Sequence, residues 1–461
     1  MARSSHLRFV FASLLFSACS SSHSNAPATG NAVGMGAGGG GGMGTEGGAM
    51  QPAGTGSGSS ASGGASSASG ASSSAPAGGS SSGGASPPTS SDGGGSSSSG
   101  GAGGSGSGST GSSSSGAASS ADAGPGTDAA TAATTDSTGD GDYTVGPTYT
   151  TSPDLMSKGT PAGKTFQLTM NSTSSQIFTG MDPNLLAANQ HSFTRQVTVY
   201  VPAKYVDGTA APFMVIQDGP GTVQVQQTGL LSNTKLALDN LTQSTNPTRR
   251  LPVFIAIAVA NGGGDGPGSE RGFEYDTVSD RYGRFIQTEV LPAVLADATI
   301  KAAYPNFALT SDPDGRGALG CSSGSPAAMS MGWFHPEWFH RIVTYSGSFV
   351  DLMTATAPER AMYPFGSWEY HSDLDLIGTS TPAKPLRVFV NSNEMDNGYT
   401  TLDSGHHNWL LANQHMAAAL KAQNYHYRYV EGLGASHCDG RVQNLTMADT
   451  LLWVWQGYPL N

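Results

Sequence analysis

The feature that most constrains this chain is a long N-terminal stretch without the side chains that build a core. Between Phe16 and Tyr143 there is no aromatic residue, no Leu and no Ile, and Gly, Ser and Ala dominate the composition. Such a segment cannot bury enough apolar surface to offset the entropy that it would lose on ordering. We therefore predict a disordered linker over residues 20–142 and one folded domain over residues 143–461.

Residues 1–19 have the pattern of an export signal. Two arginines precede the apolar run Phe9–Phe16, which is too short to span a bilayer, and small residues then lead to Cys19. The segment Leu15–Cys19 resembles a bacterial lipobox, in which the cysteine is lipidated and becomes the first residue of the mature protein. The alternative is an ordinary signal peptide that is cleaved near Ala18, with Cys19 taking no part. We expect a lipid-anchored protein that faces the periplasm or the cell exterior, or one that is otherwise secreted.

The charge balance limits the partners of the chain. Lys and Arg number 21 against 33 Asp and Glu, which gives a formal net charge of −12. This surplus of negative charge argues against nucleic acid and anionic lipid surfaces as general partners. We expect contact with a membrane only through a lipid at Cys19.

Apolar runs alternate with helical patterns in the folded part. The runs that predict strands are Phe213–Ile216, Val253–Val259, Arg316–Leu319, Ile342–Tyr345 and Leu386–Val390, and the helical patterns are Tyr282–Leu295, Pro326–Trp333, Trp409–Ala422 and Leu445–Trp455. Continuous apolar runs suit strands that are buried on both faces. The alternation implies right-handed crossovers, and so an α/β fold with a mainly parallel central sheet and helices on both faces.

The segment Gly320–Gly324 carries the pattern G-x-S-x-G with Ser322 at its centre. The pattern by itself has little weight in a chain so rich in Gly and Ser. Here, however, a strand precedes it and a helix follows it, which is the context of a nucleophile elbow. The small neighbours matter because that strand-to-helix turn is tight. We predict that Ser322 is a nucleophile.

A serine nucleophile needs a histidine base and a carboxylate that orients the base, and in this fold the order is Ser, acid, His. Asp396 and Glu394 follow the strand that ends at Val390, in what we expect to be a loop. We favour Asp396, keep Glu394 as a competitor, and note that both could be solvated loop acids. His437, in a small-residue loop after an aromatic strand, is the predicted base. The alternatives for the base are His406, His407 and His415, which lie near or on a helix after the acid and are better interpreted as surface or pocket-lining residues. The adjacent pair His406-His407 has no partner at metal-ligand spacing, so we assign no metal and no cofactor.

The tetrahedral intermediate of such a reaction needs two N–H donors. One is expected from the backbone of Ser323, and the other from the loop after an early strand, at Asp218 and Gly219. Glycine there would permit unusual backbone angles.

The sequence resembles the "Putative esterase" family of α/β-hydrolases, which includes enterochelin esterases and S-formylglutathione hydrolases. The resemblance rests on Asp218-Gly219, Arg271 with Glu274-Tyr275, the run Phe285 to Pro292, the elbow, His335-Pro336, Ser346-Gly347-Ser348-Phe349 and Trp453 to Pro459. It implies the α/β-hydrolase fold, ester or thioester hydrolysis, and a triad of Ser322, Asp396 and His437. One departure is Ser325, where the family usually has a second glycine after the elbow. The resemblance does not choose the substrate.

We therefore expect an exported serine esterase that hydrolyses carboxylic esters through an acyl-enzyme on Ser322. Its partner would be a small-molecule or polysaccharide-linked ester. One alternative is an acyltransferase of the same fold, in which a sugar hydroxyl replaces water. Another is a non-catalytic cell-surface binding module that has inherited the fold.

Two further cysteines flank the predicted catalytic pair, because Cys321 precedes Ser322 and Cys438 follows His437. Since the serine and histidine must come within hydrogen-bond reach, their neighbours are also brought close, and we predict a Cys321–Cys438 disulfide. The alternative is two buried, reduced cysteines. The pairing resembles that of tannases and feruloyl esterases and favours aromatic or plant-derived esters.

Overall fold

The computed structural model describes residues 139–460 of the chain. The expected signal peptide, the expected lipidation site Cys19 and nearly all of the expected linker lie outside the described residues. The first strand begins at Gly141, two residues ahead of the expected start of the domain. No helix within residues 139–460 is long and apolar enough to cross a bilayer.

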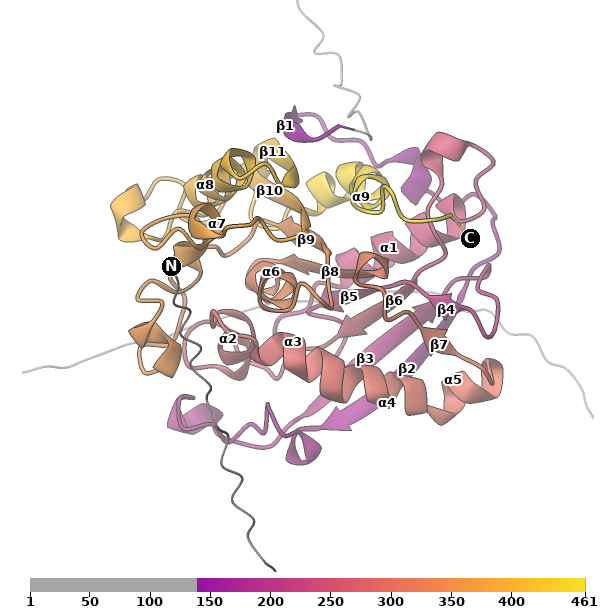
Figure 1. Ribbon diagram of the computed structural model, residues 1–461, viewed down its shortest axis with the longest axis horizontal. Coiled ribbons are helices and arrows are strands. Elements are labelled where there is room, and N and C mark those ends of the chain that lie inside the picture. Colours follow the sequence, from indigo (N-terminus) through magenta and orange to yellow (C-terminus); the bar gives the residue numbers. More distant parts are fainter. Residues whose placement is uncertain (1–138, 461) are drawn as a thin grey trace, which may run out of the picture. The chain divides into compact units, whose positions relative to one another are not determined.

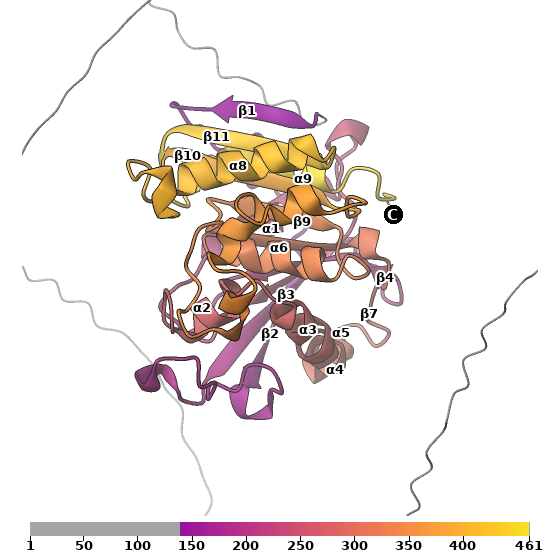
Figure 2. The ribbon, with the colours of Figure 1, turned by 60° about the vertical axis from the view of Figure 1, so that its left-hand side comes forward.

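Within this part of the chain one sheet of nine strands forms the centre of the fold (Figures 1 and 2). The strands are β1 (Gly141–Val145), β2 (Lys164–Asn171), β3 (Thr194–Val201), β5 (Phe213–Gln217), β6 (Ile255–Val259), β8 (Arg316–Cys321), β9 (Arg341–Tyr345), β10 (Arg387–Met395) and β11 (His426–Ser436). Their order is β1-β11-β10-β9-β8-β5-β6-β3-β2, and the pairings are parallel except where β3 meets β2 and β6. The predicted α/β class with a mainly parallel sheet is confirmed. Two short strands, β4 (Ala210–Ala211) and β7 (Ala308–Leu309), pair separately.

Helices cover both faces of the sheet. They are α1 (Thr228–Leu241), α2 (Glu270–Tyr275), α3 (Arg281–Phe285), α4 (Leu291–Ala296), α5 (Ala298–Ala303), α6 (Gly324–Phe334), α7 (Leu376–Thr379), α8 (Trp409–Ala422) and α9 (Gly440–Val454). Helices α3, α4, α6 and α8 pack on one face, and α1 and α9 pack on the other. The helix expected over Tyr282–Leu295 is present as α3 and α4, joined by a π-helical turn.

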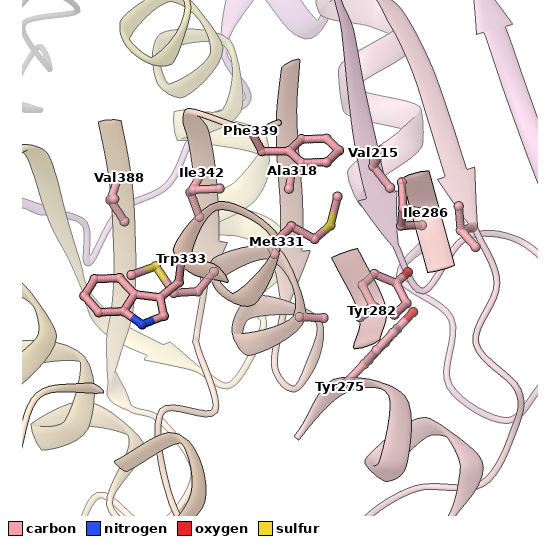
Figure 3. Close-up of a cluster of buried hydrophobic side chains, with 14 of the residues drawn as sticks. Val215, Tyr275, Tyr282, Ile286, Ala318, Met331, Trp333, Phe339, Ile342 and Val388 are labelled. Atoms are coloured by element: carbon pink, nitrogen blue, oxygen red, sulfur yellow. The ribbon is translucent and has the colours of Figure 1, made fainter. Parts of the chain in front are cut away.

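The central strands β5 and β6 are almost entirely apolar because both of their faces are buried. Along β5, Val215 faces the first helical layer, whereas Met214 and Ile216 face the second. Figure 3 shows Val215 together with Ala318 and Met331, which come from β5, β8 and α6. This arrangement fixes β8 in the middle of the sheet, so the segment that follows it emerges at the centre of the carboxyl edge.

Strands β10 and β11 are longer than the sequence pattern predicts. The stretch after Val390, expected to be a loop, continues as strand to Met395, and β11 continues to Ser436. The two strands stay paired through a bulge between Asn393 and Met395, so that Met395 lies opposite Ser436. The hydrogen bonds of this parallel ladder keep both segments in the strand conformation although their residues are largely polar. The extension places the residues after Met395 and Ser436 side by side.

Candidate active site

The turn between β8 and α6 is tight, and its sequence explains why. Ser322 adopts a left-handed backbone conformation with φ of 57°, the strained geometry of a nucleophile elbow. A Cβ atom at position 320 would lie 1.9 Å from the Gly324 carbonyl oxygen, so Gly320 cannot be replaced. Ser325, the departure from the family pattern, donates its hydroxyl proton toward the carbonyls of Gly320 (3.2 Å) and Tyr345 (3.1 Å). The turn therefore tolerates this serine.

The predicted base and acid lie against each other. His437 Nδ1 is 2.6 Å from Asp396 Oδ1, so the ring donates to the carboxylate and its Nε2 is left to accept a proton. Asp396 is 1% exposed and also accepts from the backbone N–H groups of Asn393 (3.2 Å) and Asn397 (2.9 Å). These bonds fix the carboxylate, and through it the imidazole.

The competing acid points elsewhere. Glu394 is exposed and accepts a hydrogen bond from the Gly434 N–H at 2.7 Å. Two of the other histidines, His406 and His415, pack around the ring of Trp368. Of the candidate acids, Asp396 is thus the one that meets His437.

A disulfide joins Cys321 to Cys438, with the two Cα atoms 6.2 Å apart. It ties the residue before Ser322 to the residue after His437.

In the described part of the chain the Ser322 hydroxyl forms no hydrogen bond with His437 and lies instead 3.4 Å from Ser348 Oγ. Catalytic hydrogen bonds are often long before substrate is bound.

The expected oxyanion donors at Asp218 and Gly219 need correction. The N–H of Asp218 donates to the Tyr275 hydroxyl (3.2 Å). The N–H of Gly219, two residues after the end of β5, donates to the Val259 carbonyl of β6 (2.9 Å). Both N–H groups therefore already have acceptors within the fold.

The start of α6 supplies N–H groups in their place. Those of Ser323 and Gly324 have no acceptor among the described residues, as expected for the first turn of a helix. Ser323 thus stays a predicted oxyanion donor, and Gly324 is added as a second candidate.

The Asp218 side chain has a structural role behind the elbow. It accepts two hydrogen bonds from the Arg271 guanidinium, at 3.0 and 2.9 Å, and both residues are buried. Burial by itself lowers the pKa of Arg271, but the adjacent Asp218 carboxylate outweighs burial and holds that pKa above its usual value. Nearby, burial and then the Glu274 carboxylate raise the pKa of Glu270 to about 8. Neither Glu270 carboxylate oxygen has a hydrogen-bond partner within the described residues.

Ser346, which the sequence analysis noted only as part of a family motif, links the segment that carries the acid to the segment that carries the base. Its φ is 42°, and its hydroxyl oxygen accepts from Asn393 Nδ2 (3.1 Å) and from the Cys438 N–H (3.0 Å). Asn393 also donates to the Ser436 carbonyl at 2.6 Å. These bonds hold the residue before His437 against β10 and the residue after it against Ser346, which follows β9. The described residues contain no cluster of three or more His, Cys, Asp or Glu side chains that could hold a metal ion.

Comparison with known proteins places this site in context. The family model described as "Putative esterase" matches residues 190–438, which is more than half of the chain and includes Ser322, Asp396 and His437. No curated protein matches the sequence.

Similar solved structures are esterases of low sequence identity. A ferulic acid esterase is 16% identical with a TM-score of 0.42, and the match covers 64% of this chain and 97% of that one. A ferric enterobactin esterase from Salmonella typhimurium is 16% identical with a TM-score of 0.39, and the match covers 63% of this chain but 58% of that one. An S-formylglutathione hydrolase from Agrobacterium tumefaciens is 14% identical with a TM-score of 0.39, covering 64% and 95%.

Proposed function

Because this chain belongs to the "Putative esterase" family and is a hydrolase that acts on ester bonds, we propose that it cleaves carboxylic esters through an acyl-enzyme on Ser322. The observation that carries the proposal is the 2.6 Å contact between His437 and the buried Asp396, tied by a disulfide to the elbow that presents Ser322. A base, an orienting carboxylate and a strained serine are the parts that nucleophilic ester cleavage requires.

In the proposed reaction His437 Nε2 takes the Ser322 proton as Ser322 Oγ attacks the ester carbonyl carbon. Asp396 keeps the imidazole in the tautomer that can accept this proton, and it stabilises the imidazolium that forms. The N–H groups of Ser323 and Gly324 face the oxyanion. Collapse of the intermediate breaks the bond to the alcohol, which leaves with the proton from His437. Water then attacks the acyl-enzyme by the same steps in reverse order and releases the acid and Ser322.

We further propose that the enzyme is exported and held to a membrane by a lipid on Cys19. The support is the arrangement of arginines, apolar run and small residues before Cys19, together with the length of the Gly/Ser/Ala-rich stretch that follows. In this proposal residues 1–19 carry the signal peptide and, at their end, the lipidated Cys19, residues 20–142 are a tether, and residues 143–461 form the enzyme. A random coil of that length spans roughly 60 Å, which would let the enzyme reach small-molecule or polysaccharide-linked esters away from the membrane.

Hydrolysis of p-nitrophenyl esters of increasing chain length by the purified protein tests the function. We expect Ser322→Ala to remove most of the rate and to abolish covalent labelling by a fluorophosphonate. Ser174→Ala, at an exposed serine outside the site, is the matched control and should behave as the wild type. Full activity of Ser322→Ala would show that another group carries the chemistry. Product analysis with a competing alcohol present separates hydrolysis from acyl transfer.

A further inference from the structure

A serine to which the sequence assigns no role lies against the nucleophile, and a tryptophan donates a hydrogen bond to that serine. Trp409 Nε1 donates to Ser348 Oγ over 2.9 Å, and Ser348 Oγ lies 3.4 Å from Ser322 Oγ. We propose that Ser348, oriented by Trp409, is a positioning residue that directs the Ser322 proton toward His437. This inference rests on the proposed function, because it assumes that Ser322 is the nucleophile and His437 the base.

The direction of the hydrogen bonds follows from the chemistry of the groups. An indole N–H can only donate, so Ser348 Oγ is the acceptor in its bond with Trp409. A hydroxyl group has one proton, and the bond with Trp409 does not use it. The Ser348 proton is therefore available to Ser322 Oγ. When Ser322 accepts this proton, its own proton remains free for His437 Nε2.

The backbone around the pair is held in place, so its geometry does not depend on two flexible side chains. Ser348 is fully buried, and its N–H donates to the Ser322 carbonyl at 3.2 Å. The buried Asn413 donates from Nδ2 both to the Gly347 carbonyl and to the Trp409 carbonyl, each at 2.8 Å. One amide group thus fixes the segment that carries Ser348 relative to the start of α8.

Trp409 also contacts the base, which makes the pair a bridge between the two reacting groups. Its ring meets the ring of His437 at a centroid distance of 6.1 Å and an interplanar angle of 85°. The bond with Trp409 fills one of the two lone pairs of Ser348 Oγ, and without the indole N–H both would be open to a proton from Ser322. Ser322 would then donate to Ser348, and its proton would point away from His437.

The test measures kcat and KM for p-nitrophenyl acetate in Ser348→Ala, Trp409→Phe and the double variant of the whole protein. A hydrogen bond of this kind contributes about 0.5–1.5 kcal/mol, so each single variant should lower kcat about two- to tenfold. We expect KM to stay near the wild-type value, because the proposed role of the pair is to orient the Ser322 proton and not to bind substrate. The kcat of the double variant should be no lower than that of the more impaired single variant, because both substitutions remove the same effect.

The control is Trp338→Phe, at a tryptophan that stacks on His335 outside the site, and it should keep the wild-type kcat. The inference is overturned if Trp409→Phe keeps the wild-type kcat, if the two losses multiply, or if KM changes in place of kcat. Trp409 is half-buried, so we expect Trp409→Phe to fold and to test the proposal even if Ser348→Ala does not fold. An active Ser322→Ala would instead overturn the proposed function, and the two failures are therefore distinguishable.

Discussion

Removal of the Cys321–Cys438 disulfide should weaken the fold and the active site together. The bond links residues 117 positions apart, and the chain-entropy relation for such a loop gives about 5 kcal/mol at 25 °C. A domain of ordinary stability has about 5–15 kcal/mol in total, so the loss is a large share of it. The double variant Cys321→Ala/Cys438→Ala is the appropriate perturbation, because it leaves no unpaired thiol.

The assay is urea unfolding followed by circular dichroism, with kcat measured in parallel without denaturant. We expect the free energy of unfolding to fall by about 2–5 kcal/mol. The rate should fall but not vanish, because the bond from the Cys438 N–H to Ser346 Oγ still holds the segment next to His437. Cys19→Ala is the control and should unfold as the wild type. An unchanged free energy of unfolding in the double variant, or two free thiols per wild-type molecule without reductant, would refute the reasoning.

Three further predictions concern the triad acid, a buried glutamate and the N-terminal segment. Asp396→Asn should lower kcat about 10²–10⁴-fold in the p-nitrophenyl ester assay, because His437 loses the partner that sets its tautomer, whereas Glu394→Gln should change kcat little; the reverse order would reassign the acid. Glu270, whose pKa is raised from 4.5 to about 8, stays protonated in the folded state below that pH. Its contribution to the free energy of unfolding is therefore fully present below pH 4.5 and is lost as the pH rises to about 8. Glu270→Gln should therefore flatten the pH dependence of the unfolding free energy by about 1.4 kcal/mol per pH unit in this range, and an unchanged slope would contradict the burial of a neutral acid. Deletion of residues 20–138 should leave the esterase activity unchanged, and labelling by a fatty-acid analogue should be lost in Cys19→Ala; an inactive deletion or persistent labelling would refute the tether and the anchor respectively.

Several features of the protein depend only on neighbouring residues, and these could be read from the sequence. Continuous apolar runs such as that of β6 require burial on both faces, which fixes the α/β class and the parallel sheet. The small residues around Ser322 are needed within one turn of the chain, so the elbow is visible as a local pattern. The family, and with it ester hydrolysis, is confirmed by the model match.

The partners of these residues are set by contacts between distant segments, and only the tertiary structure decided them. Asp396 rather than Glu394 meets His437 because β10 and β11 stay paired beyond the apolar core, which no local pattern in their polar ends predicts. The N–H groups of Asp218 and Gly219 are unavailable because a strand and a tyrosine far along the chain accept them. No local pattern marks Ser346, Ser348 and Trp409 as site residues. They belong to the site because the fold brings hydrogen-bond partners from distant segments to their hydroxyl and indole groups.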